Sequence, residues 1–172
     1  MKWLVLTIGG TPKIAVDSIK AEPRPDRVYF MCSAETESVG KGSAVLVLGK
    51  GNVCNSRRTD PPGPPDLPSI PVQAGLTPEQ WTLSRFDLNA DDLEDCYLKC
   101  VEAFAQIRQV DPQADIYADY TGGTKSMVVG LATAALDDGR VKLVLVTGSR
   151  GNLERSSDDE IAFVISVSKI AY

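Results

Sequence analysis

The segment 119–127 (DYTGGTKSM) limits the possible folds most, because it joins an apolar strand-like run at 114–120 to a helix-like run of small residues at 128–136. Paired glycines let the backbone turn with its N–H groups converging. The helix that follows points its free N–H groups and positive dipole end at the same place. Lys125 adds a positive charge. This junction between strand and helix therefore predicts an anion site, with phosphate as the expected ligand. Three hydroxyl side chains are expected to add donors: Thr121, Thr124 and Ser126.

A second strand-to-turn junction lies near the start of the chain. Residues 3–8 (WLVLTI) form a continuous apolar run, which is typical of a strand covered on both faces. The turn 9–12 (GGTP) follows, with Thr11 suited to cap a helix and Pro12 suited to its first position. Both Gly-Gly-Thr turns follow strands, so we expect them at the same edge of an open α/β sheet, where ligands bind.

The order of the elements predicts the fold class. We expect an α/β protein with a Rossmann-like, open, mostly parallel sheet, helices on both faces and a C-terminal β-hairpin. The hairpin strands are expected at 141–146 and 161–167, with a polar loop at 149–160 between them. A chain of 172 residues predicts a single domain, 1–172. The other expected elements are a strand at 27–32, helices at 36–48, 89–110 and 124–136, and a short strand or extended entry at 81–88. Residues 44–48 could also form a strand instead of the end of a helix.

A proline-rich excursion is expected at 51–80. Seven of the eleven prolines lie between Pro61 and Pro78, a density that removes too many backbone donors for regular structure. The segment is interpreted either as an inserted surface loop or as a flap over a ligand. Its end, 77–80 (TPEQ), carries a capping-box pattern, which predicts a short helical turn there.

Composition excludes several classes of function. The chain has no histidine, which removes Ser-His-Asp and Cys-His hydrolysis and histidine-ligated zinc. A net charge of -5 argues against a polymeric nucleic acid as partner. Cys96 and Cys100 are one helical turn apart and could form a metal-ligand pair, but two thiols without nearby partners predict core residues. We therefore expect no metal.

No part of the sequence is typical of membrane insertion or export. No stretch reaches the roughly 20 apolar residues that span a bilayer. The apolar run after Met1 is too short for a signal peptide and lacks a small-residue cleavage site. The chain as given is expected to be soluble and cytoplasmic.

Standard nucleotide-binding motifs do not match. A P-loop needs glycines where this chain has Asp119 and Thr124, and the dinucleotide fingerprint is missing after Ile8. Ordinary ATP or NAD binding is therefore weakly supported. The alternative that Gly122 and Gly123 form only a tight strand-to-helix turn stays open at this stage.

Segment 119–127 resembles the signature of the CRISPR-associated Rossmann-fold (CARF) sensors, and segment 4–12 (LVLTIGGTP) is similar to that family's first strand and loop. The two motifs and the pattern between them cover most of the chain. CARF domains form two-fold dimers that bind cyclic oligoadenylates, the second messengers made by type III CRISPR complexes. The resemblance implies an antiviral sensor that is a homodimer, with a cyclic oligoadenylate across the dimer axis as ligand and no cofactor.

The resemblance also implies a set of ligand-binding residues at the two turns. The second turn is expected to contact the phosphates and riboses of the ring, and the first turn to line the same pocket. Ser33, after the second strand, is added to the set. The ligand-binding residues implied are Ile8, Gly9, Gly10, Thr11, Ser33, Thr121, Gly122, Gly123, Thr124 and Lys125.

Three functions follow from the resemblance and the residues. The first is a sensor, with tetra-adenylate as the expected ring, that relays binding to an effector domain or membrane segment outside this chain. The Arg-x-x-x-x-His ribonuclease found in many relatives is excluded, because histidine is absent. The second is a metal-independent ring nuclease, in which the ring's own 2′-hydroxyl attacks while Lys125, Thr121 and Ser126 position it and stabilise charge. The third is a nucleotide-binding Rossmann-like domain unrelated to CRISPR.

Overall fold

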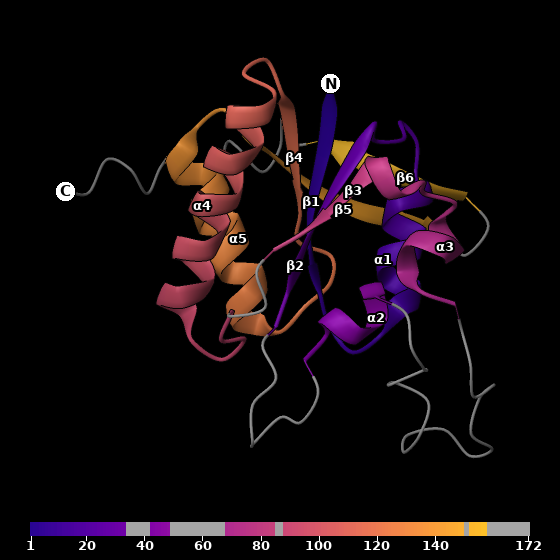
Figure 1. Ribbon diagram of the computed structural model, residues 1–172, viewed down its shortest axis with the longest axis horizontal. Coiled ribbons are helices and arrows are strands. Elements are labelled where there is room, and N and C mark those ends of the chain that lie inside the picture. Colours follow the sequence, from indigo (N-terminus) through magenta and orange to yellow (C-terminus); the bar gives the residue numbers. More distant parts are fainter. Residues whose placement is uncertain (34–41, 49–67, 85–87, 150–151, 158–172) are drawn as a thin grey trace.

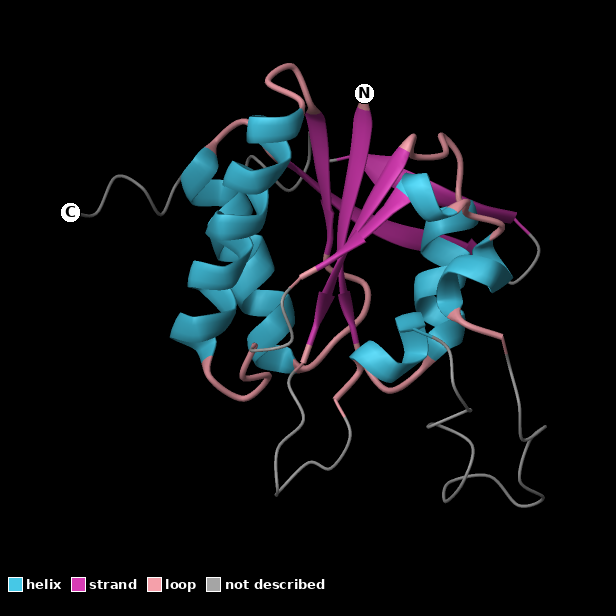
Figure 2. Ribbon diagram, viewed as in Figure 1, coloured by secondary structure: helices cyan, strands magenta, loops and turns pink. Residues whose placement is uncertain are grey.

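The computed structural model describes residues 1–33, 42–48, 68–84, 88–149 and 152–157. These residues form an open sheet of six strands in the order β3-β2-β1-β4-β5-β6, with helices on both faces (Figures 1 and 2). The expected strand over 3–8 is confirmed at the centre of the sheet, where its apolar side chains are covered from both sides. The strands are β1 (Lys2–Ile8), β2 (Arg27–Cys32), β3 (Trp81–Leu83), β4 (Asp115–Asp119), β5 (Lys142–Ser149) and β6 (Asn152–Ser157).

The first five strands in this order run parallel, and only β6 is antiparallel. Strand β1 pairs with β2 on one side and with β4 on the other, and β5 continues the parallel sheet beyond β4. Strand β6 returns against β5 as a hairpin. The expected Rossmann-like α/β fold, mostly parallel and ending in a hairpin, is therefore confirmed for the described residues.

The second hairpin strand is not where the sequence predicted it. Strand β6 occupies Asn152–Ser157, inside the stretch 149–160 that was expected to be a polar loop. An edge strand needs backbone pairing on one side only, so a polar sequence can form it without an apolar run. The expected strand at 161–167 lies outside the described residues.

The helices divide between the two faces of the sheet (Figure 2). On one face lie α1 (Pro12–Lys20), α2 (Ala44–Leu48) and α3 (Ile70–Ala74); on the other lie α4 (Leu93–Val110) and α5 (Lys125–Asp138). The last two pack closely because Gly130 has no side chain: a Cβ there would stand 2.6 Å from the Cβ of Cys96. The expected helix at 36–48 is described only at its end, as α2.

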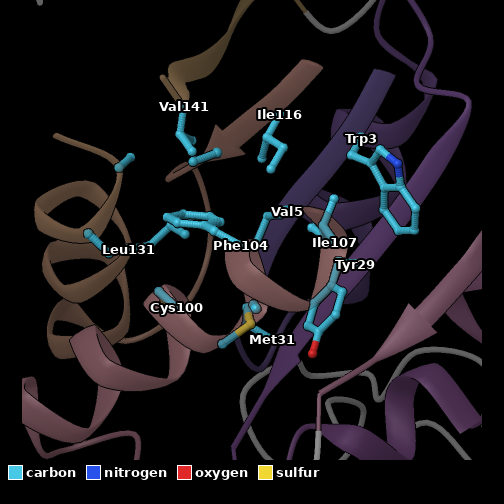
Figure 3. Packing of buried hydrophobic residues seen from close by; sticks show 14 of the residues in the cluster. Trp3, Val5, Tyr29, Met31, Cys100, Phe104, Ile107, Ile116, Leu131 and Val141 are labelled. Carbon is cyan, nitrogen blue, oxygen red and sulfur yellow. The ribbon is translucent and has the colours of Figure 1, made fainter. Parts of the chain in front are cut away.

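Two hydrophobic cores follow from this division. The core between the sheet and helices α4 and α5 is centred on Phe104, Ile116 and Leu131 (Figure 3). Cys96 and Cys100 are fully buried within it, and burial raises the pKa of the Cys96 thiol to about 11. The two cysteines are therefore core residues, as the sequence predicted. Among the described residues, no three Cys, Asp or Glu side chains are placed so that they could hold a metal ion.

The proline-rich stretch is more regular at its end than expected. Helix α3 contradicts the expectation that 51–80 holds no regular element before its capping box. Pro71 lies in the first turn of this helix, where a missing N–H costs no hydrogen bond, and Gly75 ends it with φ +74°. The expected turn at 77–80 is confirmed as the 3₁₀ helix Pro78–Gln80, with the Thr77 N–H donating to Gln80 Oε1 at 2.9 Å. Residues 51–67 lie outside the described part.

Candidate functional site

The two Gly-Gly-Thr turns meet at the carboxyl edge of the neighbouring strands β1 and β4, opposite the edge where the N label stands in Figure 1. A Cβ on Gly9 would lie 3.1 Å from the backbone nitrogen of Gly123. A Cβ on Gly123 would lie 2.6 Å from Thr7 Oγ1, and its φ of +114° disfavours any side chain. The turns are in contact because both positions are glycine.

The contact between the turns forms one wall of a pocket of about 150 Å³. The pocket lies where β1 and β4 end and where α1 begins, which is the expected ligand edge of an open α/β sheet. Twelve residues line it: Leu6, Thr7, Gly9, Gly10, Thr11, Ile14, Ala15, Ser18, Asp119, Thr121, Gly122 and Gly123.

Six of the ten expected ligand residues line this pocket, namely Gly9, Gly10, Thr11, Thr121, Gly122 and Gly123. The other four lie elsewhere. Ile8 is buried in the core beneath α1. Ser33, which follows the end of β2, forms a hydrogen bond through its hydroxyl to the hydroxyl of Ser43. Thr124 is the N-cap of α5, and Lys125 is the first residue of that helix, exposed to solvent.

The hydroxyl groups of the second turn are turned toward the protein. Thr121 donates to Asp119 and accepts from the Val146 N–H at 3.0 Å. Thr124 donates to the carbonyl of Ala90 at 2.5 Å and accepts from the Met127 N–H at 3.3 Å. The hydroxyl protons expected to serve a ligand at these two positions are therefore already used.

Ser126 follows the same pattern, since its hydroxyl donates to the carbonyl of Asp91 at 3.3 Å. Thr11 differs. It is the N-cap of α1, yet its side chain makes no capping hydrogen bond, and within the described ranges its hydroxyl has no other partner. Among the hydroxyls expected at the site, Thr11 is the one that both lines the pocket and remains available to a ligand.

In the second turn, the groups available to bind an anion are mainly backbone N–H donors. The first hydrogen bonds of α5 are made by Met127 and Val128, to the side chain and carbonyl of Thr124. The N–H groups of Gly123 and Lys125 have no acceptor among the residues that the structure describes. Such unpaired N–H groups at a helix N-terminus, with the dipole behind them, attract anions.

The sequence did not show which charged side chains lie in the pocket and which lie outside it. Lys125 forms no ion pair within the described segments and does not line the pocket. Asp119 does line it, although its side chain is only 1% exposed. Its carboxylate accepts from Ser18 Oγ, from the Thr121 hydroxyl and, at 2.7 Å, from the Thr121 N–H. Sequence reasoning noted Asp119 only as a departure from the P-loop; an acidic residue ending an apolar strand was the signal available.

Neither a protein-family model nor a curated protein matches this chain. Solved structures do match. Csm6 from Enterococcus italicus, bound to cyclic hexa-2′-fluoro-hexa-dAMP, aligns with 99% of this chain at 13% identity and a TM-score of 0.66. Can2 from Sulfobacillus thermosulfidooxidans, in complex with cyclic tetra-adenylate, aligns with 86% at 13% identity and a TM-score of 0.54. The protein VC1899 from Vibrio cholerae aligns with 85% at 7% identity and a TM-score of 0.53.

The likeness establishes the fold. The chain has a CARF-like Rossmann fold, which confirms the fold expected from the resemblance of its two turns. It covers 45% of the matched Csm6 chain, 32% of the Can2 chain and 30% of VC1899, so it spans less than half the length of each. None of the helices in the described part of the chain is long and apolar enough to cross a membrane.

Proposed function

We propose that this chain is a sensor that binds a cyclic oligoadenylate at the pocket between its two Gly-Gly-Thr turns. The observation that carries the proposal is the contact between Gly9 and Gly123, which brings the starts of α1 and α5 to one edge of the sheet. Two helix N-termini and a glycine turn with unpaired N–H groups suit a phosphate of the ring. The ligands named for Csm6 and Can2, which share the fold, support this choice.

The binding roles differ from residue to residue. We assign the phosphate contact inside the pocket to the backbone of Gly122 and Gly123. Thr124 and Lys125 lie outside the pocket lining, and we assign to the backbone of both and to the ammonium group of Lys125 the contacts with the part of the ring that extends beyond the pocket. Thr11 would donate its hydroxyl from the facing turn. Ile8 and Ser33, which lie in the core and in a hydrogen bond to Ser43, would support the site from behind.

The size of the pocket favours a dimer. At about 150 Å³ it is smaller than the roughly 300–1,000 Å³ of typical ligand pockets, so we expect one subunit to hold only part of a ring. A second copy related by two-fold symmetry would supply an equivalent pocket for the opposite phosphate of a symmetric ring. Binding would then favour one arrangement of the two subunits and pass that change to an effector outside this chain.

The test is a calorimetric titration with cyclic tri-, tetra- and hexa-adenylate, and with ATP as the control. We expect tight binding of one ring, tetra-adenylate first among them, with a stoichiometry of one ring for two chains. Equal affinity for ATP and the rings would instead favour a general nucleotide-binding domain, and no binding of any ring would refute the proposal.

A ring nuclease is the second candidate, because Lys125 is exposed and unpaired within the described segments and could stabilise charge on a phosphate. The hydroxyls of Thr121 and Ser126, expected to fix the geometry of the reaction, instead donate to protein acceptors. Among the described residues that line the pocket, none has a side chain suited to act as general base, since Asp119 is engaged by three donors. Linear products after prolonged incubation of the protein with the ring would favour cleavage.

A further inference from the structure

The pocket assigned to an anion contains a negative charge of its own. Among its twelve lining residues Asp119 is the one with an ionisable side chain. No cation bonds to its carboxylate in the described part of the chain; its partners there include Ser18 and Thr121, which are neutral. An anion entering the pocket is therefore attracted by backbone N–H groups and repelled by a buried carboxylate.

Charged side chains on the elements packed around Asp119 do not cancel this charge. On α1, Lys13 is exposed and paired with Asp17 at 2.5 Å. On β5, Lys142 is paired at 2.9 Å with Asp115, which lies at the opposite end of β4 from Asp119. On α5, Lys125 lies outside the lining.

We propose that Asp119 makes this pocket selective for phosphodiesters over phosphate monoesters. The inference rests on the proposed function. A diester carries one negative charge, whereas a monoester carries close to two above about pH 6. The backbone donors can bond either group, but the second charge of a monoester adds repulsion from Asp119 across a site partly shielded from water. A ring contains only diesters, so the carboxylate favours it over nucleotides and linear chains that end in a phosphate.

Two forms of one linear tetra-adenylate test this inference directly, one ending in a 5′-hydroxyl and the other in a 5′-phosphate. Their affinities are measured by competition against labelled cyclic tetra-adenylate at pH 8 and pH 5.5. At pH 8 we expect the natural protein to bind the 5′-hydroxyl form about tenfold more tightly. At pH 5.5 the preference should shrink, because the terminal phosphate takes up a proton with a pKa near 6.

Two variants separate charge from shape. Asp119→Asn keeps the size of the side chain and an acceptor for Thr121 but removes the charge, so the preference for the 5′-hydroxyl form should disappear at both pH values. Ser18→Ala removes one hydrogen bond to the carboxylate and leaves the charge, so the preference should persist. If the natural protein binds neither linear form, the pocket does not accept the diesters of the 5′-hydroxyl form and the inference is refuted.

Several outcomes would overturn the inference. An Asn variant that retains the preference would do so, as would a natural protein that binds neither linear form. Should that variant fail to fold, a preference in the natural protein that is equal at pH 8 and pH 5.5 would decide against it. In each case tight binding of cyclic tetra-adenylate would leave the proposed function intact, whereas failure to bind any ring would refute the proposed function itself.

Discussion

The contact between the two turns can be tested by adding one methyl group at either of two neighbouring glycines. A Cβ on Gly9 would lie 3.1 Å from the nitrogen and 3.2 Å from the Cα of Gly123, and both are backbone atoms that cannot move aside by changing rotamer. A Cβ on Gly10 would have no neighbour within 4 Å. Neither glycine has a positive φ, so the two alanine substitutions differ in space and not in backbone strain.

The expected magnitudes follow from this difference. Forcing a methyl group into the contact should destabilise the fold by about 1–3 kcal/mol, because the turns must separate by several tenths of an ångström. Gly9→Ala should also weaken ring binding at least about tenfold, since the separated turns no longer present their donors to one phosphate. Gly10→Ala should change the free energy of unfolding by less than about 0.5 kcal/mol.

Urea unfolding measures the first effect and calorimetric titration with the ring measures the second. Unfolding should be followed by circular dichroism at equal protein concentration, with the slope compared to confirm that both variants unfold in the same way. The reasoning would be refuted by Gly9→Ala and Gly10→Ala proteins of equal stability, because that result would mean that the turns are not in contact at Gly9.

Three further predictions concern the site and the packing around it. Lys125→Ala should weaken ring binding by about 1.5–3 kcal/mol through loss of a charge-assisted hydrogen bond, and Lys125→Arg should retain most of the affinity, both measured by calorimetry. Gly130→Ala should cost about 1–3 kcal/mol in urea unfolding by separating α5 from α4, whereas Val129→Ala on the exposed side of α5 should cost under about 0.5 kcal/mol. Arg108 lowers the pKa of Asp138, so this pair should stabilise the fold above about pH 4 and lose its effect as pH falls through the lowered pKa. Arg108→Gln should therefore destabilise the protein more at pH 7 than at pH 3, and equal losses at both pH values would contradict the assignment.

The position of the site at one edge of the sheet could be predicted from two short segments of the sequence. Two apolar runs, each followed by Gly-Gly-Thr, indicated two strands that end at the same edge, and β1 and β4 are indeed neighbours in the sheet. The small residues after Lys125 likewise indicated a helix that packs closely, which Gly130 confirms. These predictions succeeded because each depends on local backbone geometry and on a general rule of parallel sheets.

Features that leave no signal in their own residues were predicted less well. Strand β6 has no apolar pattern, because its pairing with β5 is made by the backbone, so periodicity pointed instead to the apolar residues 161–167. The hydroxyl of Thr124 bonds to Ala90, which lies 34 residues away, and that of Ser126 bonds to Asp91, 35 residues away. Nothing near either residue in the sequence shows that its hydroxyl is already engaged.

Asp119 shows why a site cannot be deduced from its donors alone. The motif around it contains glycines, hydroxyls and a lysine, all of which favour an anion, and in the sequence the carboxylate is simply one more polar residue. In the structure the lysine lies outside the pocket and the carboxylate lies within it, held by Ser18 from a helix that precedes it by about a hundred residues. Inside the pocket the attraction therefore comes from the backbone, and the one ionisable lining side chain among the described residues opposes that attraction. Such an arrangement would bind a weakly charged phosphate and discriminate against a strongly charged one, which is a property of the folded pocket and not of the motif.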